Sequence, residues 1–306
     1  MNPRRGLLFG AFAFTCWGLL SPSNEILLRE WSPMWMQVFR SGLAMLVLGV
    51  WLGRRGLDGA MDILRRPALV HAFLWGTLFS FGFFVMAQTR IPATFATLGF
   101  YASPLWTAIL ARFMLGERMG WSFLPTVVAL LGGGYLALTG GGQLPPPDAL
   151  GILFALAAGA TWGIYAVLLR RESPDVDGWH LLYASTLLGT IGFLLAAATT
   201  EPLPRLAAFS GTSWIWMAVL VIIPTLAALG FFQAALRHAP ATQVTILVGF
   251  ELGATVFFVW LFLHVRFTAL QLVGLAVVLV SVSLYLWGRM RLVSDDAGDQ
   301  QATHGE

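Results

Sequence analysis

Long apolar runs alternate with short polar interruptions along this chain. Ten runs of about 20 residues are visible, at 6–28, 34–53, 67–89, 93–115, 121–139, 149–169, 179–200, 212–237, 241–263 and 267–288. An α-helix of about 20 mainly apolar residues spans the hydrocarbon core of a bilayer. The pattern therefore predicts an all-α polytopic membrane protein with about ten transmembrane helices. The short connections leave no room for a soluble domain.

The composition agrees with this prediction. Only 11% of the residues are charged and 58% are hydrophobic, whereas a soluble domain carries about 25% charged residues. All 18 basic residues are arginine. They lie mostly in the connections, so the net charge of +3 does not indicate a nucleic-acid partner. A single cysteine, Cys16, excludes an intramolecular disulfide.

The arginines also predict an orientation. With a cytoplasmic N-terminus, twelve arginines fall in inner segments, and only Arg29, Arg90, Arg205 and Arg266 fall in outer loops. This bias satisfies the positive-inside rule, so we expect both termini to be cytoplasmic. The polar tail at 291–306 is expected to be disordered. A cleaved signal peptide is the alternative interpretation of the first run, and the internal repeat counts against it.

Two ungapped matches indicate that repeat. The segment "GLLFGAFAFTCWG" from Gly6 matches "GILFALAAGATWG" from Gly151 at an offset of 145, and "GFFVMAQTRIPAT" from Gly82 matches "GFFQAALRHAPAT" from Gly230 at an offset of 148. We therefore expect five-helix units at 1–140 and 149–290, joined by an outer linker at 141–148. Because five is odd, the second unit is inverted in the membrane. Inverted repeats are common in secondary transporters, with the substrate site between the repeats near the midplane.

Two segments carry a family resemblance. The stretch "RIPATFATLGFYASPLWTAILARFMLGER" resembles the fourth helix of the drug/metabolite transporter (DMT) superfamily, EamA-type branch, and "APATQVTILVGFELGATVFFVWLFLHVR" resembles its second-repeat counterpart. The chain looks most like bacterial aromatic amino-acid exporters of the cytoplasmic (inner) membrane. This resemblance implies export of amino acids and some organic cations. Leu252 replaces a family proline, and His264-Val265 replaces a Gly-Glu pair, so strictly symmetric gating is not implied.

The stretch "TCWGLLSPSNEILLRE" interrupts the first run with polar residues. Trp17, Ser21 and Asn24 share one stripe of a helix, and Pro22 removes a backbone hydrogen bond and kinks it. Polar groups at membrane depth are tolerated where protein or a water-filled cavity satisfies them. We expect this half-helix to line a cavity. Helix–helix packing is the alternative.

The repeat singles out aromatic candidates. Trp17 aligns with Trp162, and Tyr165 lies about one turn beyond it. One indole from each repeat could flank a substrate and hold an ammonium by cation–π attraction. Core packing is the alternative.

Further polar candidates lie inside other runs. Tyr101 and Ser103 lie midway along the fourth run, and Ser103 aligns with Glu251 in the ninth. An intramembrane acid such as Glu251 predicts a functional site, either a proton-linked switch or an ammonium anchor. A structural hydrogen bond is the alternative. Pro104 and Pro224, like Pro22, are predicted kinks that could take part in gating.

Arg40 lies within the second run, one turn after Gln37. Its guanidinium could hold a substrate carboxylate in a bidentate fork. A structural ion pair with Glu25 or Glu251 is the alternative.

The sequence lacks the motifs that are typical of other functional classes. No GxxxxGK[ST], HExxH or GxSxG sequence occurs, and the five histidines are scattered. An enzyme is therefore disfavoured, and no metal or cofactor is expected. The sequence predicts a secondary exporter of aromatic and neutral amino acids and related metabolites, with the lipid bilayer and the small-molecule substrate as its partners. The alternatives are an exporter of quaternary cations or drugs, and a passive metabolite uniporter.

Overall fold

The computed structural model describes residues 3–54, 56–88, 90–91, 93–117, 119–142 and 148–303. Every regular element within these ranges is a helix. The first half contains α1 (Pro3–Trp17), α2 (Leu20–Leu27), α3 (Pro33–Gly53), α4 (Asp58–Leu64), α5 (Pro67–Phe73), η1 (Leu74–Phe79), α6 (Ser80–Gln88), α7 (Ala93–Phe100), α8 (Ser103–Met114) and α9 (Phe123–Thr139). The second contains α10 (Ala149–Glu172), α11 (Gly178–Thr200), η2 (Leu206–Ala208), α12 (Gly211–Leu220), η3 (Val221–Ala227), α13 (Ala228–His238), α14 (Ala241–Thr245), α15 (Val248–Leu263) and α16 (Ala269–Thr303).

These helices group into membrane spans. Eight stretches of the described chain are long and apolar enough to cross a bilayer: Pro3–Leu27, Pro33–Gly53, Pro67–Ala87, Ala149–Glu172, Gly178–Thr200, Gly211–His238, Ala241–Leu263 and Ala269–Arg289. α9 is a shorter apolar helix, and α7 with α8 covers the predicted fourth span. The prediction of an all-α polytopic membrane fold is confirmed.

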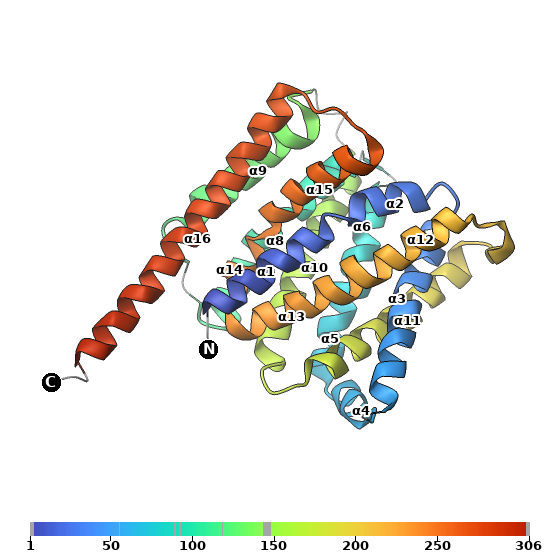
Figure 1. Ribbon diagram of the computed structural model, residues 1–306, viewed down its shortest axis with the longest axis horizontal. Coiled ribbons are helices and arrows are strands. Elements are labelled where there is room, and N and C mark those ends of the chain that lie inside the picture. Colours follow the sequence, from blue (N-terminus) through green and yellow to red (C-terminus); the bar gives the residue numbers. More distant parts are fainter. Residues whose placement is uncertain are drawn as a thin grey trace.

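The packing of the two halves has the symmetry that an inverted repeat requires. In the first half α1 packs against α13 and α15, and in the second half α10 packs against α6 and α8. The first span of each half therefore packs against the third and fourth spans of the other half, because α10 corresponds to α1 together with α2. Two pairs, α3 with α11 and α9 with α16, join corresponding spans directly (Figure 1).

Two π-helical turns occur at equivalent places. η1 interrupts the third span at Leu74–Phe79, and η3 interrupts the eighth at Val221–Ala227. The offset of 148 places these turns over one another. π-turns inside helices often mark functional sites, because they shift the backbone hydrogen-bond register. Both face the centre of the bundle, where the repeats meet.

At Pro22 and Pro104, where kinks are predicted, the helix is interrupted, between α1 and α2 and between α7 and α8. Each proline lies in the first turn of a new helix, α2 or α8, where a missing N–H costs no hydrogen bond. Pro224 lies inside η3, as a kink would.

α16 is helical through Thr303, so the tail that was expected to be disordered continues this helix over most of its length (Figure 1). No proline occurs in 291–303 to stop it.

Candidate functional site

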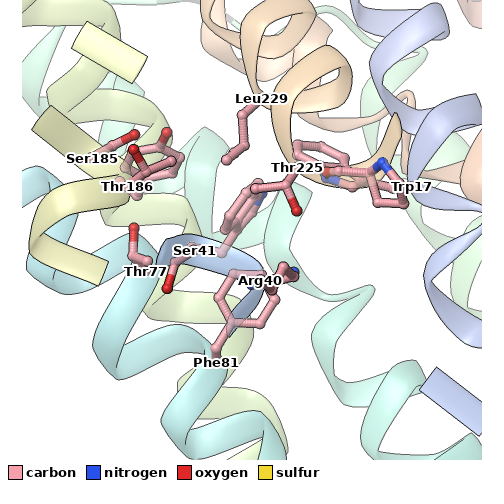
Figure 2. A pocket seen from close by; sticks show the side chains of 12 residues that line it. Trp17, Arg40, Ser41, Thr77, Phe81, Ser185, Thr186, Thr225 and Leu229 are labelled. Carbon is pink, nitrogen blue, oxygen red and sulfur yellow. The ribbon is translucent and has the colours of Figure 1, made fainter. Parts of the chain in front are cut away.

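A cavity lies at the centre of the bundle, between the two halves. Three spans of each half supply its lining, which consists of Trp17, Arg40, Ser41, Thr77, Phe81, Trp162, Tyr165, Ser185, Thr186, Pro224, Thr225 and Leu229 (Figure 2). A water-sized sphere can move through about 20 Å³ of it, which is roughly the room of one or two waters. Ligand sites for small organic molecules are a few hundred Å³. The structure therefore represents a closed, contracted state of this cavity.

The lining is built from equivalent positions of the two repeats. The offset of 145 pairs Trp17 with Trp162, Arg40 with Ser185, and Ser41 with Thr186, and the offset of 148 pairs Thr77 with Thr225 and Phe81 with Leu229. Only Tyr165 and Pro224 lack a partner in the lining. The cavity therefore lies on the pseudo-twofold axis that relates the halves.

The two tryptophans meet at this axis. The ring centroids of Trp17 and Trp162 are 5.4 Å apart, in an edge-to-face arrangement. The indole Nε1 of Trp17 donates a hydrogen bond of 2.9 Å to the carbonyl oxygen of Pro224. Phe232 packs against both indoles. One wall of the cavity is therefore a rigid aromatic surface, tied to the π-turn η3.

The glycine after each tryptophan explains how these indoles reach the axis. A Cβ on Gly18 would lie 2.3 Å from the Cβ of Ala254, and a Cβ on Gly163 would lie 3.0 Å from the backbone nitrogen of Thr107. Gly18 and Gly163 are equivalent positions. They let the first span of each repeat press against the backbone of α15 or α8, which leaves the preceding tryptophan facing the cavity.

Tyr165 lines the cavity and lies against the third span. Its ring lies on Gly76 in η1, where a Cβ would come within 2.3 Å of the tyrosine Cγ. Tyr165 is 2% exposed and packs against Trp162 and Phe232.

Arg40 is the one charged residue in the lining. It lies in the first half of α3 with only 6% of its surface exposed, and its guanidinium carbon is 4.9 Å from the centre of the Phe81 ring. None of the ion pairs among the described residues involves it, and its Nε has no hydrogen-bond partner. The predicted alternative, an ion pair with Glu25 or Glu251, is not formed. Glu25 instead pairs with exposed Arg29.

Several predicted residues lie outside this cavity. Ser21 is exposed, Asn24 is half-buried with an unpartnered Oδ1, and neither lines the cavity. Tyr101 and Ser103 are buried in the adjoining core, and Glu251 is half-buried and close enough to Tyr101 to interact electrostatically. Of the predicted residues, the structure brings Trp17, Arg40, Trp162, Tyr165 and Pro224 together in the cavity lining.

The small hydroxyl residues of the lining were not predicted from the sequence. Ser41, Thr77, Ser185, Thr186 and Thr225 were not singled out, because serine and threonine are common in membrane helices. The internal repeat could have identified some of them, since each π-turn contains a threonine and the two threonines are related by the offset of 148.

Three carboxylates close the ends of the bundle by bridging the two halves. At the end opposite the N-terminus, Glu30 accepts hydrogen bonds from Ser210 N (2.8 Å) and Ser213 Oγ (2.6 Å) at the start of α12. At the same end, Glu201 accepts from the backbone N–H groups of Met34 and Trp35 at the start of α3.

Glu117 makes the corresponding bridge at the end that holds the N-terminus. It follows α8 and accepts hydrogen bonds from Ala241 N (2.9 Å), Thr242 N (3.1 Å) and Thr242 Oγ1 (2.8 Å) at the start of α14. All three carboxylates therefore cap a helix of the other half, where the helix dipole favours negative charge.

The fold and this axial cavity define a polytopic membrane protein with two repeats around a central cavity. A family model described as the EamA-like transporter family matches residues 4–139 and again 149–287. The chain therefore belongs to the EamA-like transporter family, and it is a membrane transporter of the DMT superfamily.

Individual relatives agree with this assignment. The chain is similar to the uncharacterized transporter YojE of Bacillus subtilis, at 24% identity over 80% of each chain. It is also similar to a WAT1-related chloroplastic protein of Arabidopsis thaliana, at 26% identity over 89% of this chain and 67% of the relative. A solved crystal structure superposes with a TM-score of 0.79 over 94% of this chain and 98% of its own, at 20% identity. That likeness shows the fold.

Proposed function

We propose that this protein is a secondary transporter that exports amino acids, chiefly aromatic and neutral ones, and related metabolites across a bacterial cytoplasmic membrane. The observation that carries the proposal is the cavity on the pseudo-twofold axis, lined in pairs by both repeats. A carrier needs a site that each half of the protein can expose in turn. Inverted repeats provide this, because either half can rock against the other around a fixed midplane site.

The closed state supports alternating access. The cavity is too small for an amino acid, and carboxylate caps bridge the halves at both ends of the bundle. Opening toward one side requires the caps at that end to separate. Each cap is a small set of hydrogen bonds to partly exposed groups, which water can replace.

The aromatic lining supports the proposed substrates. Trp17, Trp162, Tyr165 and Phe81 present ring faces and edges to the cavity. Such surfaces favour apolar and aromatic side chains, with preferred ring contacts at 4.5–7 Å.

We propose the orientation in which both termini are cytoplasmic. The arginine bias supports it. In this orientation Glu117 closes the cytoplasmic end, and Glu30 and Glu201 close the outer end.

Counterflow in proteoliposomes tests the function. Vesicles are loaded with unlabelled phenylalanine, threonine, methionine or glutamate, and uptake of the same labelled compound is followed against protein-free vesicles, with methyl viologen as the cation arm. Accumulation of a labelled neutral amino acid supports the proposal. Movement of methyl viologen alone would favour the quaternary-cation exporter instead. No counterflow by verified folded protein would refute an amino-acid carrier.

A further inference from the structure

The charge of Arg40 has no opposite charge paired with it among the residues that the structure describes. It is buried among the lining residues, contacts the face of Phe81, and forms no ion pair with any described carboxylate. Its Nε is buried without a hydrogen-bond partner. A buried charge is costly unless it is paired, and an unpaired one in a membrane span is expected to serve a function.

Arg40 is also the exception to the repeat symmetry of the lining. The other equivalent pairs in the lining keep their chemical character: two tryptophans, two hydroxyl pairs, and an apolar pair. At the fifth pair, Arg40 faces Ser185. A residue that only maintains the repeat architecture would be present in both repeats. The positive charge of Arg40 therefore has a role that is confined to one side of the cavity.

The remaining polar groups of the cavity supply acceptors. Four hydroxyls donate their protons to carbonyls of their own helices at 2.7–3.0 Å: Ser41 to Gln37, Ser185 and Thr186 to Leu182, and Thr225 to Leu220. Their oxygens therefore keep lone pairs for the cavity. No acidic side chain of the described chain lines it. One cation with several neutral acceptors matches a ligand that carries an anion and, at most, a hydrogen-bond donor.

We propose that Arg40 binds the carboxylate of the transported molecule, so that the substrates are small organic carboxylates with an apolar body and are not cations. This inference rests on the proposed function and narrows its substrate class. In an α-amino acid, the carboxylate meets Arg40, the amino group meets the hydroxyl oxygens, and the side chain packs against the aromatic wall. Figure 2 shows the side chains that would make these contacts, with Arg40 beside Phe81, and Ser185 and Thr186 across the cavity from Trp17.

The first test changes the ligand and leaves the protein intact. Phenylalanine, phenyllactate, phenylalanine amide and phenethylamine compete for counterflow of labelled phenylalanine. We expect both carboxylates to compete, and the amide and the amine to compete at least tenfold less well. Equal competition by the amide and the acid would overturn the inference.

The second test changes Arg40. Arg40→Met removes the charge at similar length, and Arg40→Lys keeps the charge without the fork. Arg112→Met is the matched control, because Arg112 lies in α8, is exposed, and does not line the cavity. We expect Arg40→Met to lose the preference for acid over amide, and Arg112→Met to keep it. An unchanged acid-to-amide ratio in Arg40→Met would refute the assignment. If Arg40→Met does not fold, the ratio in Arg40→Lys and the ligand series decide.

A binding measurement separates this inference from the carrier function. Purified wild-type protein is heated with each of the four compounds. A rise in the melting temperature with the carboxylates, absent in Arg40→Met, supports the carboxylate site even if counterflow fails, and only the carrier proposal is then lost. Stabilisation by phenethylamine and not by the acids would overturn the inference while leaving a carrier possible.

Discussion

Glu117 offers the sharpest test of how this transporter opens. Its carboxylate is half-buried and accepts three hydrogen bonds at the start of α14, two of them from backbone N–H groups. Loss of a helix N-cap costs about 0.5–2 kcal/mol, and hydrogen bonds to a charged group contribute about 1.5–3 kcal/mol each when shielded. Because water can reach this carboxylate, we expect Glu117→Ala to weaken closure of this end by about 1–3 kcal/mol in total. That corresponds to a shift of about 5- to 150-fold in the open population.

Thiol labelling measures this shift. The native Cys16 is replaced by serine, and Thr225→Cys in the cavity serves as the reporter. Glu117→Ala should speed labelling by a small reagent added on the side of Glu117. The matched control is Asp62→Ala, which removes an exposed acid whose ion pair with Arg65 stays within one helical turn. Equal labelling rates in Glu117→Ala, Asp62→Ala and the parent would refute a role for this cap in closure.

Three further predictions follow from the same contacts. An unpaired arginine in a membrane span destabilises the protein by roughly 2.5–3.5 kcal/mol, and a cation–π contact offsets only about 0.5–2 kcal/mol of this. Arg40→Met should therefore raise the melting temperature of the protein. A clear fall would show that Arg40 has a structural partner. Hydrogen bonds from Ser213 and Ser210 lower the pKa of Glu30 below its usual 4.5. The helix cap that Glu30 makes is therefore fully present above pH 4.5 and is lost as the pH falls through the lowered pKa. Hydrogen exchange at the start of α12 should accelerate only in that acid range, and Glu30→Gln should abolish this pH dependence. Gly18→Val should reduce the yield of folded protein, because its Cβ would overlap Ala254, whereas Gly132→Val, with open space around it, should not; equal yields would contradict the close-packing argument.

The spans were predictable because their signal is local. Each apolar run carries its own length and composition, and these alone decide whether a helix can cross a bilayer. The aromatic centre was predictable for a different reason. Trp17 and Trp162 are single residues of a common type, but the repeat places them at equivalent depth, and equivalent positions meet at the pseudo-twofold axis.

The prolines and glutamates show which structural features cannot be predicted from a single segment of the sequence. Pro22 within an apolar run predicts a kinked helix. In the structure the helix has already ended at Trp17, and Pro22 begins the next one. Nothing in the sequence next to Glu117 indicates its hydrogen-bond partners, which lie 124 and 125 residues further along the chain. Glu251 is an acid in a span, yet it does not line the cavity. Each outcome depends on which helices pack together, which no single segment encodes.

The site combines a symmetric frame with asymmetric chemistry, and each part suits a carrier. Symmetry between the halves makes the two open states comparable in free energy, since the same kinds of contact break and form at either end. Full symmetry would, however, present a substrate with two identical half-sites and no preferred orientation. Two departures from symmetry remove that ambiguity: Arg40 is equivalent to Ser185 in the other repeat, and Tyr165 has no equivalent residue in the lining. A carboxylate held at one side of the axis fixes the substrate relative to the first repeat, so the second repeat can move past it. On this argument the charge at Arg40 both selects the substrate and determines which half of the protein carries it.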